Sequence, residues 1–322
     1  MSYLVVIAVV LGVILVKTYL DIAQLMLKLN GKQDFSVTNR ESNNQATLFI
    51  VFGIAFAIFI IWQLQGWGDK LLPESASVHG VDYDILMNIS LWLCAVVFVI
   101  THIVLIGVIW KNRYQNGRIA SFFNHSNKLE LVWTIIPSIG LAVLISYGLY
   151  NWNSLMKPVD ESIEHTKIEL YAKQFDWTAR YAGEDMTFGA ANVSYIGETN
   201  KLGLNPTDAN AKDDKIVTGE FHIPVDLPVQ FVMRSQDVIH SAYMPHFRAQ
   251  MNCVPGLKTQ FNFIPKFTTE EMREITGNEE FDYVLLCNKI CGAAHFNMQM
   301  KIVVDTPEDY KAWLEQQEAV TL

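Results

Sequence analysis

The chain has 322 residues, of which 51% are apolar and 18% are charged, and its mean hydropathy is +0.18. Soluble proteins carry about 25% charged residues, so this composition argues against two soluble domains and predicts membrane spans. Residues 1–152 hold nine Lys and Arg against eight Asp and Glu, whereas residues 153–322 hold fifteen against twenty-five. A nearly neutral apolar half therefore precedes an acidic half, and this acidity argues against nucleic acid as a partner, because phosphates are bound by Lys and Arg.

Three apolar segments without charged residues, 47–64, 85–110 and 131–150, each come close to the length that crosses a bilayer as a helix. The apolar run 3–16 is shorter and also fits the core of a signal peptide. No Lys or Arg precedes it and no Ala-x-Ala pattern follows it. We therefore predict a retained helix that continues to about residue 28, with a cleaved signal as the alternative.

The connecting loops predict the orientation of these spans. Loops 17–46 and 111–128 are rich in Lys and Arg, whereas loop 65–84 has one Lys against four acids. Basic loops stay in the cytoplasm. Both termini and the acidic half are therefore expected on the outer face, in a bacterium the periplasmic face of the inner membrane.

After residue 152 the pattern changes to short alternating runs separated by Pro, Gly, Asn and Asp, which is typical of an all-β sandwich or barrel. Residues 197–219 are predicted to form a long polar surface loop. The tail 306–318 is predicted to be a short helix with Thr306 as its N-cap and Pro307 in its first turn. The predicted strands lie within 168–181, 220–235, 256–265, 282–290 and 298–305.

The stretch CNKICGAAHFNM carries Cys287, Cys291, His295 and Met298 at spacings of four, four and three, on a predicted loop between two strands. Thiolate, imidazole and thioether are soft or borderline donors, and together they favour copper over zinc. Two thiolates can bridge two ions, and such a site would need a second imidazole. His240, predicted to lie at the end of an earlier strand, supplies a candidate. A structural Cys2His2 zinc site, a Cys287–Cys291 disulfide and an ordinary packed His240 remain alternatives.

From residue 84 to about 315 the chain resembles subunit II of cytochrome c oxidase, in the haem-copper oxidase family. The resemblance implies a membrane α plus all-β fold, in which a transmembrane hairpin at 84–152 precedes an outer-facing cupredoxin-like β-sandwich or barrel at 153–322. Residues 1–83 would form an additional membrane region, with spans at about 3–28 and 47–64. The motifs that carry the resemblance are KLELVWTIIP, KQFDW, LGLNPTDANAKDDKIV, SQDVIHSAYMPHFRAQMNCVPG and CNKICGAAHFNM.

The resemblance also implies a dinuclear copper A centre. Its ligands would be His240, Cys287, the main-chain carbonyl of Lys289, Cys291, His295 and Met298. Family members usually have Glu at the position of Lys289, and that Glu also reaches a magnesium ion at the interface with subunit I. Lys289 cannot ligate a cation, so the magnesium site is not expected in this chain.

Four further positions acquire candidate roles from the resemblance. The family motif Gln-Trp-x-Trp places the entry point for electrons at its first Trp, where this chain has Phe175, and only the second, Trp177, matches. Phe175, Trp177 and Tyr243 are therefore the candidates for electron entry, although Trp177 also fits plain core packing and the donor could instead dock differently. Glu130 aligns with the entrance of a proton pathway into subunit I, and it equally fits an acid favoured at a helix start.

The predicted function is electron transfer from a c-type cytochrome, through the copper centre, to haem in subunit I, where oxygen is reduced to water and protons are pumped. Expected partners are subunit I, further oxidase subunits, membrane lipid and, through the two additional spans, a quinol:cytochrome c reductase in a supercomplex. The acids near the copper loops in sequence are Glu184, Asp185, Asp237 and Asp282. They fit an ordinary solvated surface, and the acidic balance is also consistent with a negative face that steers a basic cytochrome.

The alternative function is a membrane-anchored cupredoxin-like binding or assembly protein with a structural metal site.

Overall fold

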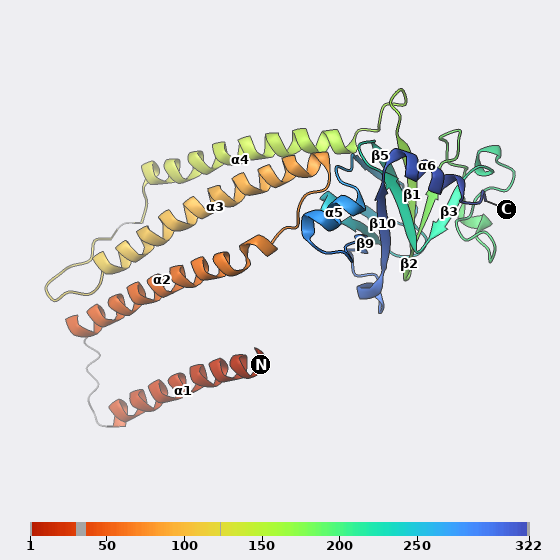
Figure 1. The fold of residues 1–322 in the computed structure, drawn as a ribbon. Helices are drawn as coiled ribbons and strands as arrows, with labels where there is room; N and C mark the ends of the chain where they lie inside the picture. The colour runs from red at the N-terminus through yellow and green to blue at the C-terminus, as the bar shows by residue number, and fades with distance from the viewer. Residues whose placement is uncertain (1, 30–36, 123, 321–322) are drawn as a thin grey trace. The chain divides into compact units, whose positions relative to one another are not determined.

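Four long helices come first in the chain and the strands follow, in the order that the sequence predicts (Figure 1). The computed structural model describes residues 2–29, 37–122 and 124–320. Its helices are α1 (Ser2–Leu29), α2 (Asn39–Trp67), α3 (Val78–Lys111), α4 (Asn127–Met156), α5 (Thr269–Thr276) and α6 (Pro307–Glu315).

Among the described residues, α2, α3 and α4 are long and apolar enough to cross a membrane. They contain the three predicted segments and extend beyond each, because polar residues at both ends continue the helix past the apolar stretch. The helix predicted over residues 3–28 is present as α1, and its crossing of the membrane stays a prediction. Part of the predicted basic loop 17–46, residues 30–36, lies outside the described residues.

The chain divides into two compact units, Met1–Leu64 with Phe98–Asn124 and Gln65–Val97 with His125–Leu322. In the first unit α2 packs against α3, where the ring of Phe56 lies 6.4 Å from that of His102. The second unit holds the whole β domain, and every candidate site residue belongs to it.

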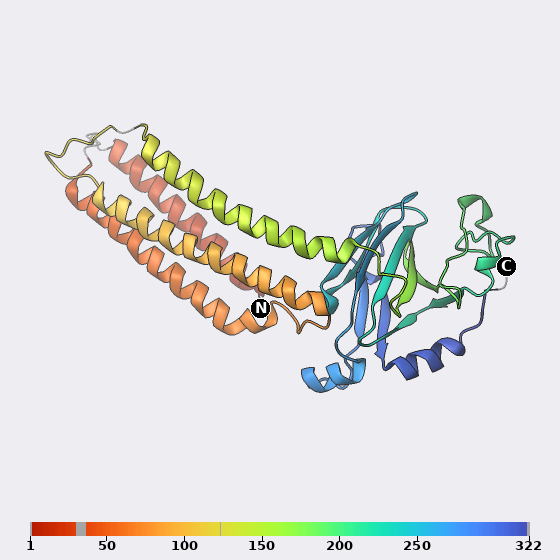
Figure 2. The same ribbon diagram turned by 90° about the horizontal axis from the view of Figure 1, so that it is seen from above.

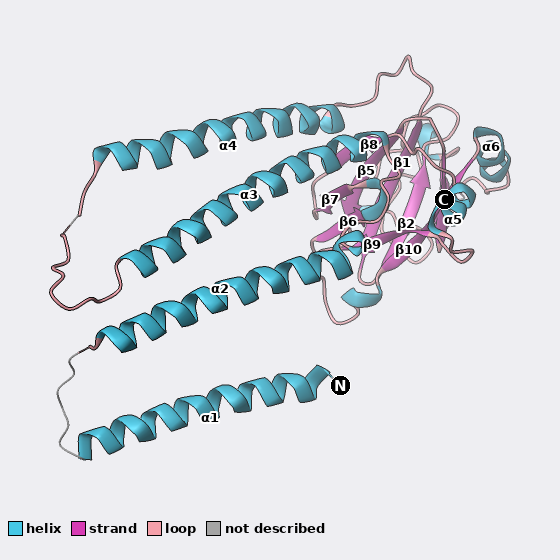
Figure 3. Ribbon diagram, turned by 60° about the vertical axis from the view of Figure 1, so that its left-hand side comes forward, coloured by secondary structure: helices cyan, strands magenta, loops and turns pink. Residues whose placement is uncertain are grey.

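The β domain is a sandwich of two five-stranded sheets, in the orders β3-β2-β1-β5-β8 and β4-β10-β9-β6-β7. The helices α5 and α6 lie on the outside of the sheets (Figure 2). Figure 3 shows the strands gathered in this domain alone. Its strands are β1 (Thr166–Lys173), β2 (Asp176–Tyr181), β3 (Lys215–Thr218), β4 (Glu220–Pro224), β5 (Val229–Ser235), β6 (His240–Met244), β7 (Ala249–Cys253), β8 (Thr259–Phe263), β9 (Tyr283–Cys287) and β10 (Gln299–Asp305).

The core lies between the two sheets and follows from the alternation that the sequence displays. In β5 every second residue, beginning with Val229, is buried. The ring of Phe231 on this strand lies 5.4 Å from that of Phe261 and 5.3 Å from that of Phe263 on β8. Burying such aromatic rings contributes a large part of the stability of a small domain. The prediction of an all-β sandwich is confirmed.

The strand register brings four connections to one end of the sandwich, which we call the site end. They are residues 174–175 between β1 and β2, 236–239 between β5 and β6, 254–258 between β7 and β8, and 288–298 between β9 and β10.

Two local predictions need correction. Residues 197–219 do not form a surface loop throughout, because Leu202 and Leu204 are buried against Tyr171 on the outer face of β1, and the last residues form β3. His240 begins a strand rather than ending one, because β5 stops at Ser235 and a turn separates it from β6. The predicted tail helix is confirmed as α6, with the Thr306 side chain accepting from Asp309 N.

The first turns of α3 and the residue before it, Ser77, are bound to the β domain by side-chain contacts. The guanidinium of Arg248 binds both carboxylate oxygens of Asp84, at 2.7 and 2.9 Å. The hydroxyl of Ser77 donates to the carbonyl of Phe247 at 2.7 Å. A bidentate, largely buried pair of this kind fixes orientation as well as distance, so the β domain is held firmly on the first turns of α3.

Candidate metal centre

The connection between β9 and β10 folds so that four side chains with soft or borderline donor atoms meet. Cys287 ends β9, and Cys291 follows one turn later with its Sγ 3.9 Å from that of Cys287. His295 opens a single 3-10 turn and places Nδ1 3.7 Å from Cys291 Sγ. Met298, the residue before β10, places Sδ 3.8 Å from the same sulfur. The spacing of four, four and three thus gathers these side chains as the sequence predicts.

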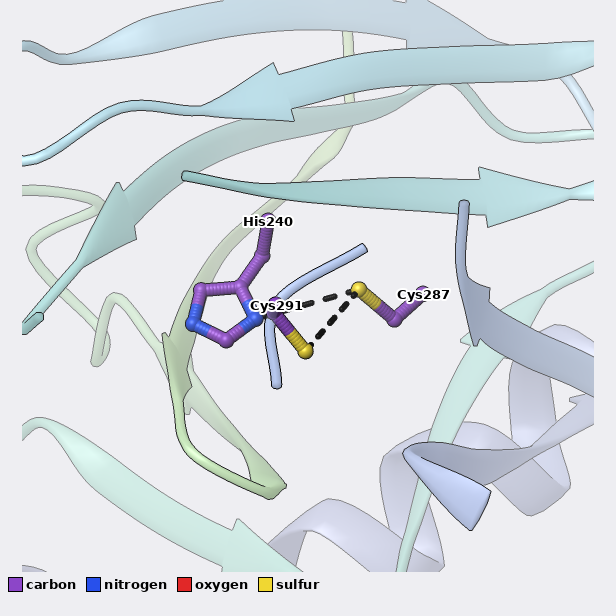
Figure 4. Close-up of side chains that lie close together, drawn as sticks. All are labelled: His240, Cys287 and Cys291. Atoms are coloured by element: carbon purple, nitrogen blue, oxygen red, sulfur yellow. Dashed lines mark hydrogen bonds between the residues drawn. The ribbon is translucent and has the colours of Figure 1, made fainter. Parts of the chain in front are cut away.

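His240 reaches this group from the neighbouring strand β6 (Figure 4). Its side chain is fully buried, and its Nδ1 lies 3.8 Å from Cys287 Sγ. Its Nε2 lies 2.9 Å from a carboxylate oxygen of Asp237. A carboxylate on the second ring nitrogen holds that nitrogen protonated, which leaves Nδ1 with its lone pair toward the sulfur.

The main chain supplies one more donor. The carbonyl oxygen of Lys289 lies 3.2 Å from Cys287 Sγ, while the Lys289 side chain is exposed. Any residue has this carbonyl, so Lys in place of the usual Glu leaves the donor intact. Its ammonium offers no lone pair to a second cation.

Burial shapes the chemistry of the thiols. Cys291 is 5% exposed and Met298 is 1% exposed, whereas Cys287 and His295 are partly open to solvent. Burial, together with the adjacent Cys287, raises the pKa of the Cys291 thiol to about 11. Two neighbouring thiolates repel one another unless a cation lies between them. A metal ion would therefore displace protons on binding, and its affinity should rise with pH.

The side chains of His240, Cys287, Cys291, His295 and Met298, which we call the donor set, have the chemistry of a metal site. Their spacing fits two ions better than one. Metal–sulfur bonds are about 2.3 Å long, so two sulfurs 3.9 Å apart can share an ion. The ligand atoms of His240, Cys287 and Cys291 lie within 4.8 Å of one another. His295 is outside this cluster of three and approaches it through Cys291. In a tetrahedral one-ion site all four donors are mutual neighbours, whereas here each sulfur has its own imidazole.

Residues outside the donor set hold the loop in place. The Gln174 side chain donates to the carbonyl of Cys291, and its backbone N–H donates to Asp237 at 2.7 Å. Gly292 has φ +145, and a Cβ there would lie 2.8 Å from the ring of Phe175. Only glycine suits this backbone and this close approach. The loop is therefore clamped against the β1–β2 turn of the opposite sheet.

Phe175 and Trp177, both candidates for electron entry, differ in their exposure to solvent. Phe175 is 36% exposed and its ring lies against Gly292, next to Cys291. Trp177 is fully buried, with its ring 6.3 Å from that of His240 and edge-on to it. Trp177 thus packs against the ring of His240 in the core, while Phe175 reaches the surface.

Glu130 lies on α4 and does not contact the donor set. It lies in the first turn of α4, exposed, with a carboxylate oxygen 2.9 Å from His125 Nδ1. The N-cap of α4 is Ser126, whose side chain accepts from Leu129 N. Glu130 therefore also fits its second expected role, as an acid in the first turn of a helix.

The sequence alone does not predict Gln174 and Gly292 as contacts of the loop, and it predicts Asp237 only as a surface acid. The spacing of Asp237 three residues before His240 was visible, and a carboxylate near a ligand histidine is a common orienting group. The other two contacts join the β1–β2 turn to the β9–β10 connection, and no local sequence pattern predicts them.

The chain is similar to known proteins along most of its length. Residues 60–151 match the family "Cytochrome C oxidase subunit II, transmembrane domain", and residues 166–306 match "Cytochrome C oxidase subunit II, periplasmic domain". The "Alternative cytochrome c oxidase subunit 2" of Bradyrhizobium diazoefficiens is 33% identical over 274 residues, covering 84% of this chain and 91% of the relative. The "Cytochrome c oxidase subunit 2" of Synechocystis sp. is 23% identical over 291 residues, covering 84% and 82%.

Among solved structures, the periplasmic domain of subunit II of cytochrome oxidase from Bradyrhizobium japonicum has 19% identity and a TM-score of 0.33, covering 50% of this chain and 95% of that one. The two family matches together span α3, most of α4 and the strands of the β domain, and the first relative passes 30% identity over most of both chains. The chain therefore belongs to the cytochrome c oxidase subunit II family, as a membrane protein with a C-terminal periplasmic domain.

Proposed function

We propose that the β domain binds a dinuclear copper A centre and passes electrons from a c-type cytochrome to haem in subunit I, where oxygen is reduced to water and protons are pumped. The observation that carries this proposal is the elongated donor set, in which two buried or half-buried sulfurs each have their own imidazole. The proposed ligands are His240, Cys287, the carbonyl of Lys289, Cys291, His295 and Met298.

The chemistry of the donors supports copper over zinc. Zinc takes Cys and His readily but has little use for a thioether, and it does not change its oxidation state. The Met298 sulfur lies 3.8 Å from Cys291 Sγ, in a position to bind an ion held by that thiolate. A pair of copper ions, when bound, would take up and release one electron.

The residues of this chain would then perform three tasks. Asp237 orients His240 through a 2.9 Å contact and keeps Nδ1 available as a ligand. Gln174 and Gly292 fix the loop, so that donor positions change little between oxidation states. Trp177 and Met298 exclude water from the inner side of the set, because both are almost fully buried.

Electron entry is proposed at Phe175, because its ring is partly exposed to solvent and also lies against Gly292 in the β9–β10 connection. Trp177 is proposed as packing support for His240. Glu130 is proposed as the entrance of the proton pathway, on its position in the first turn of α4 and its exposed carboxylate. No magnesium ligand is proposed at Lys289. Contacts of the additional N-terminal helices with lipid and with a quinol:cytochrome c reductase belong to the same proposal.

The second candidate, a membrane-anchored binding or assembly protein with structural zinc, is not favoured. A closed zinc site needs four mutually close donors, and His295 stands apart from the cluster of three.

The proposed function predicts that the copper-loaded full chain in detergent oxidises a reduced c-type cytochrome. Stopped-flow absorbance of the cytochrome should show one electron transferred per chain, because the two ions share a single electron. The metal-free chain is the matched control and should leave the cytochrome reduced. Equal behaviour of the loaded and metal-free chains would contradict the proposal.

A further inference from the structure

Lys289 is the one Lys, Arg, Asp or Glu in the connection between β9 and β10. Its side chain is exposed to solvent, but the backbone on both sides of it is fixed. The N–H of Asn288 donates to the carbonyl of Ser241 on β6 at 3.0 Å. The carbonyl of Cys291 accepts a hydrogen bond from the Gln174 side chain. A positive charge is therefore held at a defined place beside the donor set.

No carboxylate of the described chain compensates that charge. In the part of the chain that the structure describes, the ammonium of Lys289 has no hydrogen-bond or ion-pair partner. Asp237, on the connection between β5 and β6, is already engaged by the backbone N–H of Gln174 at 2.7 Å and by His240 at 2.9 Å. The counter-charge of Lys289 therefore has to come from solvent or from another chain.

Three of the four acids that lie near the copper loops in sequence are remote from this end of the sandwich. Asp282 precedes β9, at the end opposite Cys287, and pairs with Lys301 at 3.3 Å. Glu184 and Asp185 follow the end of β2 that lies away from the site end. These three acids therefore form no negative face around the metal loop and cannot serve as partners of its lysine.

The family implies a magnesium ion at this position, and the donor groups of this chain do not fit one. Magnesium takes oxygen ligands and is usually bound through one or two carboxylates together with water. The Lys289 carbonyl lies 3.2 Å from Cys287 Sγ, and its ammonium has no lone pair to offer. Among the described residues, the His, Cys, Asp and Glu side chains that are grouped closely enough to hold an ion are His240, Cys287 and Cys291. All three are soft or borderline donors, which suit copper and not magnesium.

A lysine can replace the glutamate and its ion together. A carboxylate and a magnesium ion carry a net charge of +1, and an ammonium group carries the same charge. Counted along the side chain from Cα, an ion bound to a Glu oxygen is the fifth atom, and Nζ of a lysine is the fifth atom as well. The ammonium of Lys289 therefore brings an equal charge to nearly the same distance from the loop.

We infer that Lys289 takes the place of the magnesium ion at the interface with subunit I, where its ammonium forms an ion pair with a carboxylate of that subunit. This inference rests on the proposed function, in which the metal loop faces subunit I. An ion pair enclosed by an interface is screened by salt much less than an exposed one. The pair therefore fixes the position of the metal loop on subunit I without a metal ion. A Lys289 that stays in solvent is the other outcome of the test.

The first test is cross-linking of the purified oxidase complex with a water-soluble carbodiimide, which joins an amine to a carboxylate where the two are in contact. We expect mass spectrometry to find Lys289 joined to an acidic residue of subunit I. Lys258 is the matched control, because it is exposed in the neighbouring connection 254–258 and should give no such product. A complex in which Lys289 forms no cross-link to subunit I would overturn the inference.

The second test uses manganese, which binds the same octahedral oxygen sites as magnesium and is detected by electron paramagnetic resonance. Complexes are purified from cells grown with Mn²⁺ and washed with a chelator. The Lys289→Glu complex should retain one Mn²⁺ more than the wild type, because the carboxylate restores the missing ligand. Lys258→Glu makes the same change of charge and should retain no additional ion. An assembled Lys289→Glu complex that gains no Mn²⁺ would contradict the replacement of the ion by Lys289, and if that variant does not assemble, the cross-link decides.

The copper content of the same complexes separates this inference from the proposed function. A wild-type complex that has the dinuclear copper signal but no cross-link at Lys289 leaves the proposed function standing and removes the inference. A complex that lacks the copper signal, yet gives the cross-link and gains Mn²⁺ in the Lys289→Glu variant, contradicts the proposed function alone.

Discussion

Replacing Cys291 by Ser is expected to abolish binding of the proposed dinuclear copper centre. Cys291 is the central donor, since its Sγ lies 3.7–3.9 Å from donor atoms of Cys287, His295 and Met298. Loss of a group that merely orients a ligand weakens metal binding by about 10–100-fold. Loss of a bridging thiolate should exceed that range, and electron transfer from the cytochrome should fall to the metal-free level.

The measurement is copper per chain, by elemental analysis, together with the electron paramagnetic resonance spectrum. Cys253→Ala is the matched control, because Cys253 is fully buried opposite His240 but is not one of the proposed ligands. Burial raises the pKa of its thiol to about 12, so it remains a protonated, apolar group. The control should keep two copper ions per chain. A Cys291→Ser protein that retains both ions and their signal would refute the assignment of Cys291.

Replacing Arg180 by Met is expected to have the largest effect on stability. Arg180 is 1% exposed and lies 2.5 Å from Glu169 and 3.1 Å from Asp214, which are equally buried. It also donates to the carbonyl of Gly189 at 3.0 Å. Removing one member of a buried ion pair leaves uncompensated charge and costs about 3–5 kcal/mol. The free energy of unfolding of the β domain should fall by about this amount.

The loss should depend on pH in a defined direction. Burial raises the pKa of Asp214 to about 6 even with Arg180 beside it. The ionised carboxylate therefore costs free energy in the fold above pH 6, and this cost disappears as pH falls toward the ordinary value near 4. Without Arg180, Asp214 loses the cation that offsets this cost, whereas Glu169 keeps Arg234 at 3.4 Å. The destabilisation should be larger at pH 8 than at pH 5.

Urea titration of the full chain in detergent, followed by the β-sheet signal in circular dichroism, measures both effects. The control is Lys311→Met, which breaks an exposed pair with Glu164 at a distance of 3.1 Å. Exposed pairs contribute about 0–1 kcal/mol, so this variant should unfold almost as the wild type does. Equal unfolding midpoints for Arg180→Met and Lys311→Met would contradict the importance of the buried network.

The membrane spans and the donor loop could be predicted because their signals are local. Apolar runs without charge define α2, α3 and α4, and four donors within twelve residues define the loop after Cys287. The Thr306–Pro307 pair likewise predicts the start of α6. In each case the residues of the sequence pattern are the same residues that form the helix or the loop.

Contacts between distant strands could not be predicted in this way. Arg180 and Glu169 are polar residues in strands, and only the pairing of β1 with β2 makes them opposite and buried. The place of His240 at the start of β6 depends on where β5 ends. The uneven distribution of acids also follows from topology, because Asp282 is five residues from Cys287 yet lies at the other end of β9.

The central claim is that the donor set holds two copper ions that share one electron. The most direct measurement is the metal content and the electron paramagnetic resonance spectrum of the full chain reconstituted with copper. We predict two copper ions per chain and one unpaired electron delocalised over both nuclei. One zinc ion per chain, or a single copper with a localised electron, would contradict the claim and leave the chain with the family fold alone.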